Sequence, residues 1–297
     1  MNPFFTIIVP SYNRADLIGK TIESILQQQF SNFELIVVDD GSSDNTDEVV
    51  KAFQDDRFFY FKKENGERGA TRNYGIRLSK GRYITFIDSD DLLYPNSLQN
   101  AYDNLLNLEY PQCFAQAFEV IDVDSSKQLQ APASFETNTI NEQLIEGNFL
   151  GCIGVFVKNE VLQQLNFEED RMFAGTEDWL LWLQLSARFP FYFSNVVCAC
   201  MIEHQNRSVL SFSEEKLLYR SNHLKDKLLE DNIFVERYGL KVVHGIFAHM
   251  LSYTALHLAM SGKKGRAIKY LIDAGKANFS ELFKRRTLGI FKTILMK

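Results

Sequence analysis

Residues 33–44 read Phe33-Glu34-Leu35-Ile36-Val37-Val38-Asp39-Asp40-Gly41-Ser42-Ser43-Asp44. An apolar run of this length, followed at once by acids, glycine and serine, predicts a buried strand that ends in a polar loop. A helical pattern then follows, with Val49, Val50 and Phe53 on one face. Strand, polar loop and helix in this order are the unit from which parallel sheets with helices on both faces are built.

The same unit recurs along the first hundred residues. Further apolar strands are predicted at 4–9, 57–61 and 82–87, and helices at 18–26 and 69–79. Further along the chain we predict a loop at 122–140, strands at 151–157 and 191–201, a helix at 177–189 and helices from 213 onward. The pattern therefore predicts an α/β fold with a mostly parallel sheet flanked by helices and a helical C-terminal extension.

Composition places the chain among soluble globular proteins. It has 297 residues, 45% of them hydrophobic and 24% charged, and no apolar run approaches the roughly 20 residues of a membrane span. The first residues lack the basic stretch and cleavage site of a signal peptide, so we expect a cytoplasmic protein. The cysteines fit neither a CxxC pair nor a disulfide framework, which favours buried thiols; they are Cys113, Cys152, Cys198 and Cys200.

Charge is distributed unevenly along the chain. Residues 262–297 carry ten Lys or Arg and two acids, a net charge of +8, whereas the rest of the chain carries −14. On a helix, Leu288, Phe291 and Leu295 would share a stripe with bases nearby. A basic amphipathic helix of this kind suits an anionic membrane surface. The alternative is a helix docked on the protein's own core with solvated lysines. Nucleic acid is not expected, because the body is acidic and no binding motif is present.

Three of the predicted strands end in polar clusters, and the carboxyl ends of parallel strands share one edge of a sheet. The fourth strand ends in Asp88-Ser89-Asp90. Two carboxylates on such a loop suit Mg²⁺ or Mn²⁺ together with the oxygens of a diphosphate. The alternative is a polar turn before the next helix. The convergence of several acids at one edge favours the metal.

The remaining clusters each allow two interpretations. Tyr12 either stacks on a planar base or is a half-buried aromatic, and Asp39-Asp40 can accept hydrogen bonds from a base or ribose. The arginines of residues 66–73 favour phosphate at a helix start, or are simply solvated. Glu177-Asp178 supplies a general base, or consists of acids favoured at the positive end of a helix.

Taken together, these motifs resemble the inverting glycosyltransferases of family 2, which have the GT-A fold. The stretches that carry the resemblance are Ile7 to Asn13, Glu34 to Asp44, Gly69-Ala70-Thr71-Arg72-Asn73-Tyr74-Gly75-Ile76, Asp88-Ser89-Asp90-Asp91 and Gly175-Thr176-Glu177-Asp178-Trp179. The ordered match covers roughly residues 4–210. We therefore expect a GT-A domain at 1–212, with a nucleotide-binding half at about 1–95 and an acceptor half at about 96–212, and a helical extension at 213–297.

The resemblance implies a role for each matched residue. Pro10, Tyr12, Asp39 and Asp40 would line the base and ribose, while Arg14, Arg68, Arg72, Asp88 and Ser89 would lie along the nucleotide and diphosphate. Asp90, helped by Asp88, would hold Mn²⁺ or Mg²⁺. Asp178 would be the catalytic base with Glu177 beside it. His204 matches a recurring position near the diphosphate and would join the metal site; the alternative is a surface histidine, since Glu203 precedes it where the family often has arginine.

The implied reaction is metal-assisted transfer of a sugar, with inversion, from a nucleotide-diphosphate sugar to an acceptor hydroxyl. A UDP-sugar is the favoured donor, and a glycan or lipid-linked glycan in surface polysaccharide or glycolipid assembly is the expected acceptor. The basic tail would then bring a cytoplasmic protein to the inner face of the membrane. Two alternatives stay open: a non-catalytic sugar-nucleotide-binding module and a nucleotidyltransferase. An NAD-dependent enzyme is disfavoured, because the first strand is followed by Pro10 to Arg14 rather than by a glycine-rich loop.

Overall fold

The computed structural model describes residues 2–122, 127–203 and 213–296 of the chain. Two compact units share these residues. The first consists of 1–140, 149–181 and 189–207, and the second of 141–148, 182–188 and 208–297. The second unit thus gathers two short earlier segments around the C-terminal helices. The functional halves expected at about 1–95 and 96–212 stay a prediction.

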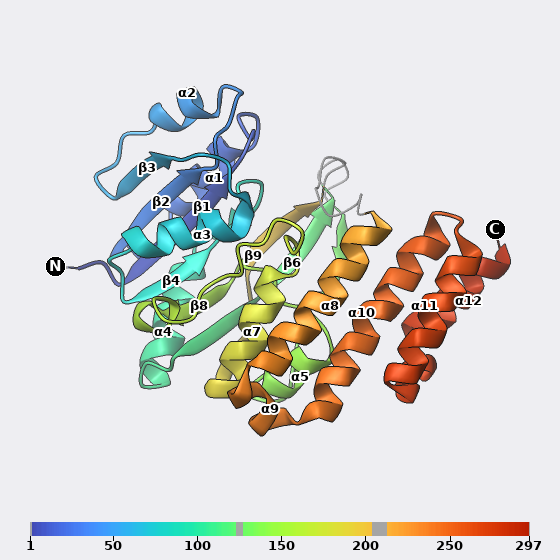
Figure 1. Ribbon diagram of the computed structural model, residues 1–297. Helices are drawn as coiled ribbons and strands as arrows, with labels where there is room; N and C mark the ends of the chain where they lie inside the picture. The colour runs from blue at the N-terminus through green and yellow to red at the C-terminus, as the bar shows by residue number, and fades with distance from the viewer. Residues whose placement is uncertain (1, 123–126, 204–212, 297) are drawn as a thin grey trace. The chain divides into compact units, whose positions relative to one another are not determined.

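The first unit is built on one mixed sheet (Figure 1), which confirms the predicted α/β class. Its strands are β1 (Phe5–Ser11), β2 (Phe33–Asp39), β3 (Phe58–Lys62), β4 (Tyr83–Phe86), β5 (Leu92–Leu93), β6 (Cys113–Asp122), β7 (Gln128–Gln130), β8 (Val155–Lys158) and β9 (Phe191–Glu203). They are ordered β3-β2-β1-β4-β8-β6-β9-β5, and β7 pairs with β6. Strands β1 to β4 pair with one another in parallel, as the sequence predicts.

Helices cover both faces of this parallel part. They are α1 (Ile18–Leu26), α2 (Thr46–Lys51), α3 (Glu67–Leu78) and α4 (Ser97–Asn107). One core cluster joins Ile7 and Val9 of β1 to Ile22 of α1 and Leu98 of α4. Successive side chains of a strand point to opposite faces, so Ile8 faces the other side. There it meets α3, where a Cβ on Gly75 would lie 2.6 Å from the Ile8 Cγ2 atom. Glycine at this position therefore lets α3 pack directly on β1.

The sheet continues beyond β4 with antiparallel neighbours. Strand β8 is antiparallel to both β4 and β6, while β6 and β9 run parallel to each other. Strand β6 was not predicted, and it supplies the longest pairing in this part of the sheet. Within the described residues of the expected loop at 122–140, Asp122 ends β6 and the short β7 is the other strand. The short helix α6 (Asn159–Leu162) and the first residues of α7 (Glu177–Arg188) complete the unit.

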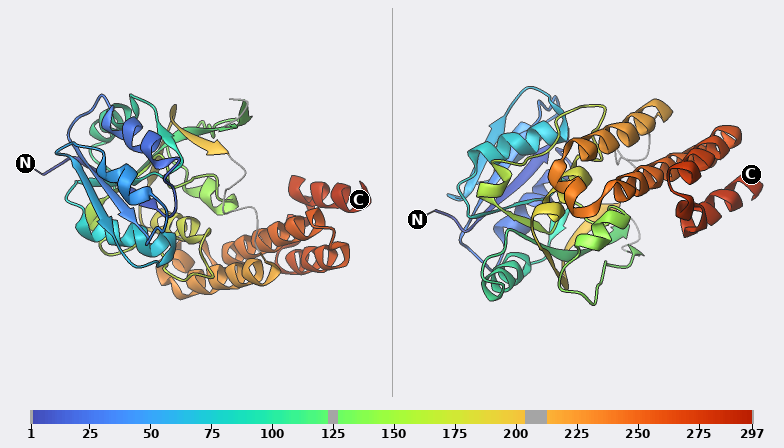
Figure 2. Two further views of the ribbon diagram at one scale, coloured as in Figure 1. Left: turned by 90° about the horizontal axis from the view of Figure 1, so that it is seen from above. Right: turned by 60° about the horizontal axis from the view of Figure 1, so that its bottom comes forward.

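The second unit is helical, as expected. Its elements are α5 (Asn141–Glu146), the end of α7, α8 (Glu214–Glu230), α9 (Asn232–Tyr238), α10 (Leu240–Met260), α11 (Lys264–Ala277), the 3₁₀ helix η2 (Phe279–Phe283) and α12 (Arg285–Met296). Helices α8 and α11 pack along α10 in all three views (Figures 1 and 2). Apolar side chains of α10, α11 and α12 form the core, among them Leu251, Leu271 and Ile290.

Helix α10 is long and apolar enough to cross a membrane by length and composition, although the sequence analysis predicted no such segment. Within its most apolar 18-residue window, 56% is buried inside the structure. The prediction for the cysteines is confirmed, since all four are buried free thiols.

Candidate functional site

The polar loops after β1, β2 and β4 come together at one edge of the sheet, all within the first unit. In the register of the parallel strands, Ser11 pairs with Asp39 and Asp39 pairs with Lys62. The Ile87 amide donates to the Ile8 carbonyl at 3.1 Å, so the loop that begins at Asp88 leaves the sheet beside the end of β1. Strand ends that share one edge explain why residues far apart in sequence form one site.

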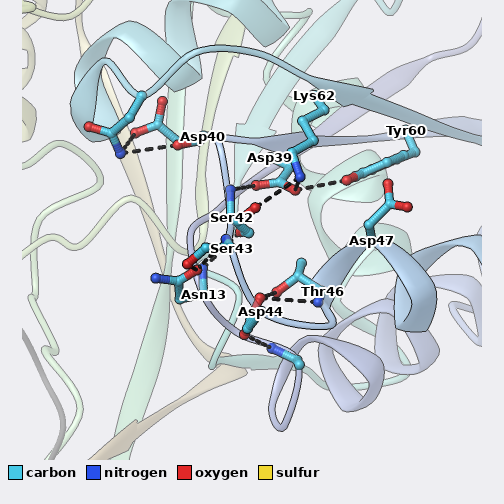
Figure 3. A network of polar contacts seen from close by, with 12 residues as sticks. Asn13, Asp39, Asp40, Ser42, Ser43, Asp44, Thr46, Asp47, Tyr60 and Lys62 are labelled. Atoms are coloured by element: carbon cyan, nitrogen blue, oxygen red, sulfur yellow. Dashed lines mark hydrogen bonds and ion pairs between the residues drawn. The ribbon is translucent and has the colours of Figure 1, made fainter.

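Asp39 organises the loop after β2 (Figure 3). Its Oδ1 accepts a hydrogen bond from the Ser42 amide at 2.7 Å, and its Oδ2 accepts one from the Tyr60 hydroxyl at 2.8 Å. The Lys62 Nζ lies 3.7 Å from the same Oδ2. Burial, and then the bond to Asp39, raise the pKa of Tyr60 well above its usual value, so the phenol stays a donor. The fully buried Asp39 carboxylate therefore fixes the shape of this loop.

Asp40 joins the same loop to helix α3. Its Oδ1 accepts from the Gly66 amide at 2.8 Å and its Oδ2 from the Glu67 amide at 2.9 Å. Lys63 and Asn65 also donate to this carboxylate. A carboxylate at the positive end of a helix satisfies amides that the helix leaves without partners. Asp40 thus caps α3 from a distant part of the sequence.

The loop after β1 is held against the loop after β2. The Asn13 amide donates to the Ser42 Oγ at 2.8 Å, and its Oδ1 accepts from the Ser43 amide at 2.9 Å (Figure 3). Asn13 has a φ of 51°, a left-handed conformation that asparagine tolerates. Pro10 is buried in β1, whereas the Tyr12 side chain is 48% exposed. The Tyr12 ring is therefore open to a planar ligand.

The acids after β4 form a cluster that suits a divalent metal. One ligand oxygen from each of Asp88, Asp90 and Asp91 lies within 4.8 Å of the others. Asp91 is buried and accepts from the Ile202 amide at 3.0 Å, which ties the loop to β9. Asp88 and Asp90 are partly exposed, and they present hard oxygen donors of the kind that Mg²⁺ and Mn²⁺ prefer. Ser89, between them, is buried.

Two arginines neutralise this cluster. The Arg72 Nη2 donates to the Asp88 Oδ1 at 2.8 Å, and the Arg14 Nε lies 3.6 Å from the Asp90 Oδ2. Arg72 is 2% exposed, and its other terminal nitrogen, Nη1, donates to the Glu177 Oε1 at 2.8 Å. A single buried guanidinium therefore links the metal motif after β4 to the Glu-Asp motif at the start of α7.

Glu177 is held as an ionised carboxylate. Burial alone would raise its pKa, but Arg68, Arg72 and the backbone amide of Gly175 outweigh that effect and lower it. The Thr176 amide also donates to the Glu177 Oε2, at 3.0 Å. Arg68 lies farther away, with its Nε 4.0 Å from Oε1. A buried carboxylate with this many donors is a fixed anchor for Arg72 rather than a proton acceptor for a substrate.

Asp178, the next residue, is partly exposed, and its Oδ1 accepts from the Trp179 amide at 2.7 Å. Burial acts most strongly on the pKa of Arg72 and of the Cys152 thiol, and the charge of Asp178 raises both pKa values. Asp178 directly follows Glu177, the partner of Arg72. Its own carboxylate is partly exposed to solvent. The arrangement allows this acid to take up a proton at the site.

The structure brings the predicted site residues to one edge, except His204, which lies outside the described residues. Sequence patterns did not identify Lys62, Lys63 and Tyr60, which hold Asp39 and Asp40. One signal was present. Lys62 and Lys63 directly follow the third predicted strand, and the end of that strand was not counted among the polar clusters. Cys152 was expected to be buried, but no sequence pattern placed it beside Arg72.

The chain is similar in sequence to known glycosyltransferases. Residues 6–164 match Glycosyl transferase family 2. The Escherichia coli UDP-Glc:alpha-D-GlcNAc-diphosphoundecaprenol beta-1,3-glucosyltransferase WfgD is 30% identical, over 84% of this chain and 96% of its own length. The GalNAc(5)-diNAcBac-PP-undecaprenol beta-1,3-glucosyltransferase of Campylobacter jejuni is also 30% identical, over 78% of this chain and 75% of its own length. An uncharacterized glycosyltransferase of Rickettsia felis is 28% identical over 79% of this chain, and the match spans 40% of that longer relative.

Solved structures share the fold at low identity. Residues 1–349 of Staphylococcus aureus TarS, in complex with UDP-GlcNAc, superpose with a TM-score of 0.66 at 17% identity, over 93% of this chain and 90% of that one. The mannosyltransferase PcManGT of Pyrobaculum calidifontis, in complex with GDP-Man and Mn²⁺, gives a TM-score of 0.56 at 17% identity, over 99% and 84% of the two chains. These matches show the GT-A fold.

Proposed function

The chain belongs to glycosyl transferase family 2, and from this premise we propose that it transfers a sugar from a nucleotide-diphosphate donor to an acceptor hydroxyl with inversion. The observation that carries the proposal is the line Asp88–Arg72–Glu177, which joins the Asp88–Asp90 cluster to the residue before the partly exposed Asp178. A metal-binding pair and a proton acceptor at one site are the two requirements of such a transfer.

The donor's nucleotide would lie over the loops after β1 and β2. Tyr12 offers an exposed ring to the base, and the loop that Asn13, Asp39 and Asp40 fix would present Pro10 and its own polar groups to base and ribose. Both TarS in its complex with UDP-GlcNAc and the Escherichia coli relative named for UDP-Glc favour a UDP-sugar for this chain.

The diphosphate would lie between the acids after β4 and the arginines. Asp88 and Asp90 would hold Mn²⁺ or Mg²⁺, which supplies positive charge to the diphosphate oxygens when it is bound. Arg14 and Arg72 already neutralise these acids in the protein alone, so either arginine can shift part of its charge to an incoming diphosphate. Arg68 is the next cation along α3 and would face the same group.

The reaction follows from the charge that develops. Breaking the bond between the anomeric carbon and the diphosphate oxygen leaves negative charge on the diphosphate, beside the arginines. Asp178 would remove the proton of the acceptor hydroxyl as its oxygen attacks the anomeric carbon from the opposite face, which inverts that centre. Glu177 would orient Arg72 and stay ionised throughout.

For the acceptor we propose a lipid-linked glycan, by analogy with the two undecaprenol-dependent relatives. The protein would then work in surface polysaccharide or glycolipid assembly from the cytoplasmic side of the membrane, with peripheral contact through its basic C-terminal residues. The experiment that tests the function is turnover with a panel of UDP-, GDP- and dTDP-sugars in Mn²⁺, with mass analysis of a lipid-linked acceptor.

The result we expect is release of the nucleoside diphosphate with a product of inverted anomeric configuration. Binding of a sugar nucleotide without turnover on any acceptor would indicate a non-catalytic binding module. Formation of a sugar nucleotide from a sugar phosphate and a nucleoside triphosphate would indicate a nucleotidyltransferase instead.

A further inference from the structure

Helix α12 uses one face to pack within the second unit. Ile290 is fully buried in the core of α10 and α11, and Ile294 packs partly against it. The Thr287 Oγ1 donates to the Glu281 carbonyl at 2.9 Å, which fastens the helix to η2. Positions 287, 290 and 294 recur at helical spacing, so they form a single stripe. The helix is therefore docked by these residues and not by the apolar stripe 288, 291 and 295 noted in the sequence.

That second stripe is exposed. Among the described side chains of residues 279–295, five bulky apolar ones are exposed: Phe279 is 68% exposed, Phe283 73%, Leu288 65%, Phe291 48% and Leu295 83%. The rings of Phe279 and Phe283 contact each other edge to face, with centroids 5.4 Å apart. We call these five residues the apolar stripe. An exposed apolar group of this density is unusual on a soluble surface and marks a contact site.

The exposed charges within residues 279–295 are all positive. Lys284, Arg285 and Lys292 are exposed. Glu281 is the sole acid of residues 279–297, and it is fully buried, where its Oε1 accepts from the Ser252 hydroxyl at 2.7 Å and its Oε2 pairs with Lys284 at 2.8 Å. Residues 279–295 therefore present hydrophobic and cationic groups without an exposed acid of their own.

A buried polar network keeps this surface in place. The Arg286 Nη1 donates to the His249 carbonyl at 3.0 Å and lies 3.2 Å from the Ser252 Oγ. Ser252 in turn bonds to Glu281, so α10, η2 and α12 are joined through side chains. Arg286 is thus a structural cation, whereas the neighbouring Arg285 is exposed. The apolar stripe sits on an anchored helix rather than on a loose end of the chain.

We propose that the apolar stripe and its flanking bases form the surface that binds an anionic lipid bilayer. The inference rests on the membrane contact proposed above and names the residues that make it. Aromatic and leucine side chains would enter the interface between headgroups and acyl chains, while Arg285 and Lys292 would face the anionic headgroups and Lys284 would stay paired with Glu281. A bilayer suits this surface better than an acidic protein partner does. The five bulky apolar side chains need an apolar phase, and the bases need negative charge, and an anionic bilayer offers both.

The test is co-sedimentation of the intact chain with vesicles of equal parts phosphatidylglycerol and phosphatidylcholine. We expect the variant Phe283→Ser/Leu288→Ser/Phe291→Ser to bind at least about tenfold more weakly than the wild type. Its control is Ile233→Ser/Leu240→Ser, which changes two exposed apolar residues of the same unit, 47% and 54% exposed, and should bind as the wild type does. All five positions are exposed, so unchanged thermal unfolding is expected for both variants.

A second pair of variants tests the charges. Arg285→Gln/Lys292→Gln should weaken binding by about fivefold for each base, and vesicles of phosphatidylcholine alone should abolish that difference. The control Lys20→Gln/Lys241→Gln changes the net charge equally at exposed sites elsewhere and should bind as the wild type does.

The possible failures are distinguishable. Absence of vesicle binding by the wild-type chain would overturn the membrane contact itself. Wild-type binding by the serine variant would overturn the assignment to this surface, as would an oligomer that only this variant dissociates in sedimentation velocity. Neither readout uses a sugar nucleotide, so both are independent of the proposed transfer, which the turnover assay tests alone.

Discussion

At the scale of single residues, neighbouring acids at the site have different tasks. Asp90 is partly exposed on a loop and pairs with Arg14, so its loss removes a metal ligand without emptying the core. We expect Asp90→Ala to lose nearly all Mn²⁺-dependent transfer while its thermal unfolding stays close to that of the wild type. Activity against added Mn²⁺, with unfolding followed by circular dichroism, checks this. Full activity of the wild type in EDTA would contradict the metal assignment.

Glu177 and Asp178 provide the sharpest contrast between adjacent residues. Asp178→Asn keeps the size of the side chain and loses the proton acceptor, so we expect transfer to fall by about 10²–10⁴-fold with donor binding and stability retained. Glu177→Gln removes one partner of the buried pair with Arg72, which should lower the free energy of unfolding by about 3–5 kcal/mol. Single-turnover assays and urea unfolding of both variants separate the two effects. Equal loss of stability in the two variants would refute the assignment.

The residue scale also shows where sequence reasoning ends. Acid motifs after apolar strands were enough to predict the edge of the sheet at which the site lies. They could not show that Tyr60, Lys63 and the start of α3 hold Asp39 and Asp40, because these groups approach through pairings with no local pattern. Whether Asp39 and Asp40 also contact a nucleotide stays a prediction.

At the scale of elements, continuous apolar runs made β1 to β4 predictable, whereas β6 was missed. Its run is interrupted by Gln116 and Glu119, which reads as a surface segment. In the structure Gln116 is fully buried, and its amide nitrogen donates to the Ser97 hydroxyl at 2.8 Å while its oxygen accepts from Asn100. A buried glutamine satisfied by helix α4 is a tertiary arrangement, so periodicity alone does not reveal the strand.

Helix α3 depends on a close approach to β1. Gly75→Ala would place a methyl group 2.6 Å from the Ile8 Cγ2 atom, so either the helix or the strand must move. We expect a loss of about 1–3 kcal/mol in the free energy of unfolding, together with weaker donor binding, because α3 carries Arg72. Gly289→Ala is the control. It lies inside α12 with no atom within 4 Å of the new Cβ, and should be neutral or stabilising by up to about 1 kcal/mol.

The contact between α10 and α12 should depend on pH through His249. Burial first, and then the charges of Arg286 and Lys284, lower the pKa of His249 from 6.5 to about 3. Since the folded-state pKa is the lower one, the unfolded chain takes up the proton first as the pH falls. Stability that is present above pH 6.5 is therefore lost between pH 6.5 and 3, at about 1.4 kcal/mol for each pH unit. Burial lowers the pKa of His257 as well, with the same sign.

From pH 6.5 to 5 we therefore expect the second unit to lose about 2 kcal/mol of its free energy of unfolding. Urea unfolding across this range measures the slope. His249→Gln keeps a hydrogen-bond acceptor for Arg286 and removes the titrating ring, so its slope should be flatter. An unchanged slope would show that another group causes the pH dependence. Glu177 affects stability in a lower pH range. Its pKa is lower in the folded protein than the ordinary carboxylate value of about 4.5, so the stability it contributes is lost only as the pH falls below that value.

At the scale of the whole molecule, the charge asymmetry of the sequence corresponds to the division into two units. The acids of the candidate site lie in the first unit, and the tail of net charge +8 lies in the second. The sequence predicted a helical extension with a basic end. It could not show that residues 141–148 and 182–188 join that extension, because such membership depends on contacts made across the chain.

The two units should cooperate when the acceptor is embedded in a membrane. Binding of the second unit to a bilayer confines the first unit to the surface that holds the acceptor, which raises the effective acceptor concentration without any new contact at the site. We therefore expect Arg285→Gln/Lys292→Gln to raise the KM for a lipid-linked acceptor in anionic vesicles by about tenfold or more at unchanged kcat. With a water-soluble acceptor, the same variant should match the wild type in both constants. Because salt screens the bases, 0.5 M NaCl should raise the wild-type KM for the embedded acceptor toward that of the variant. A variant impaired equally on both acceptors would show that these bases act on the transfer itself and not through the membrane.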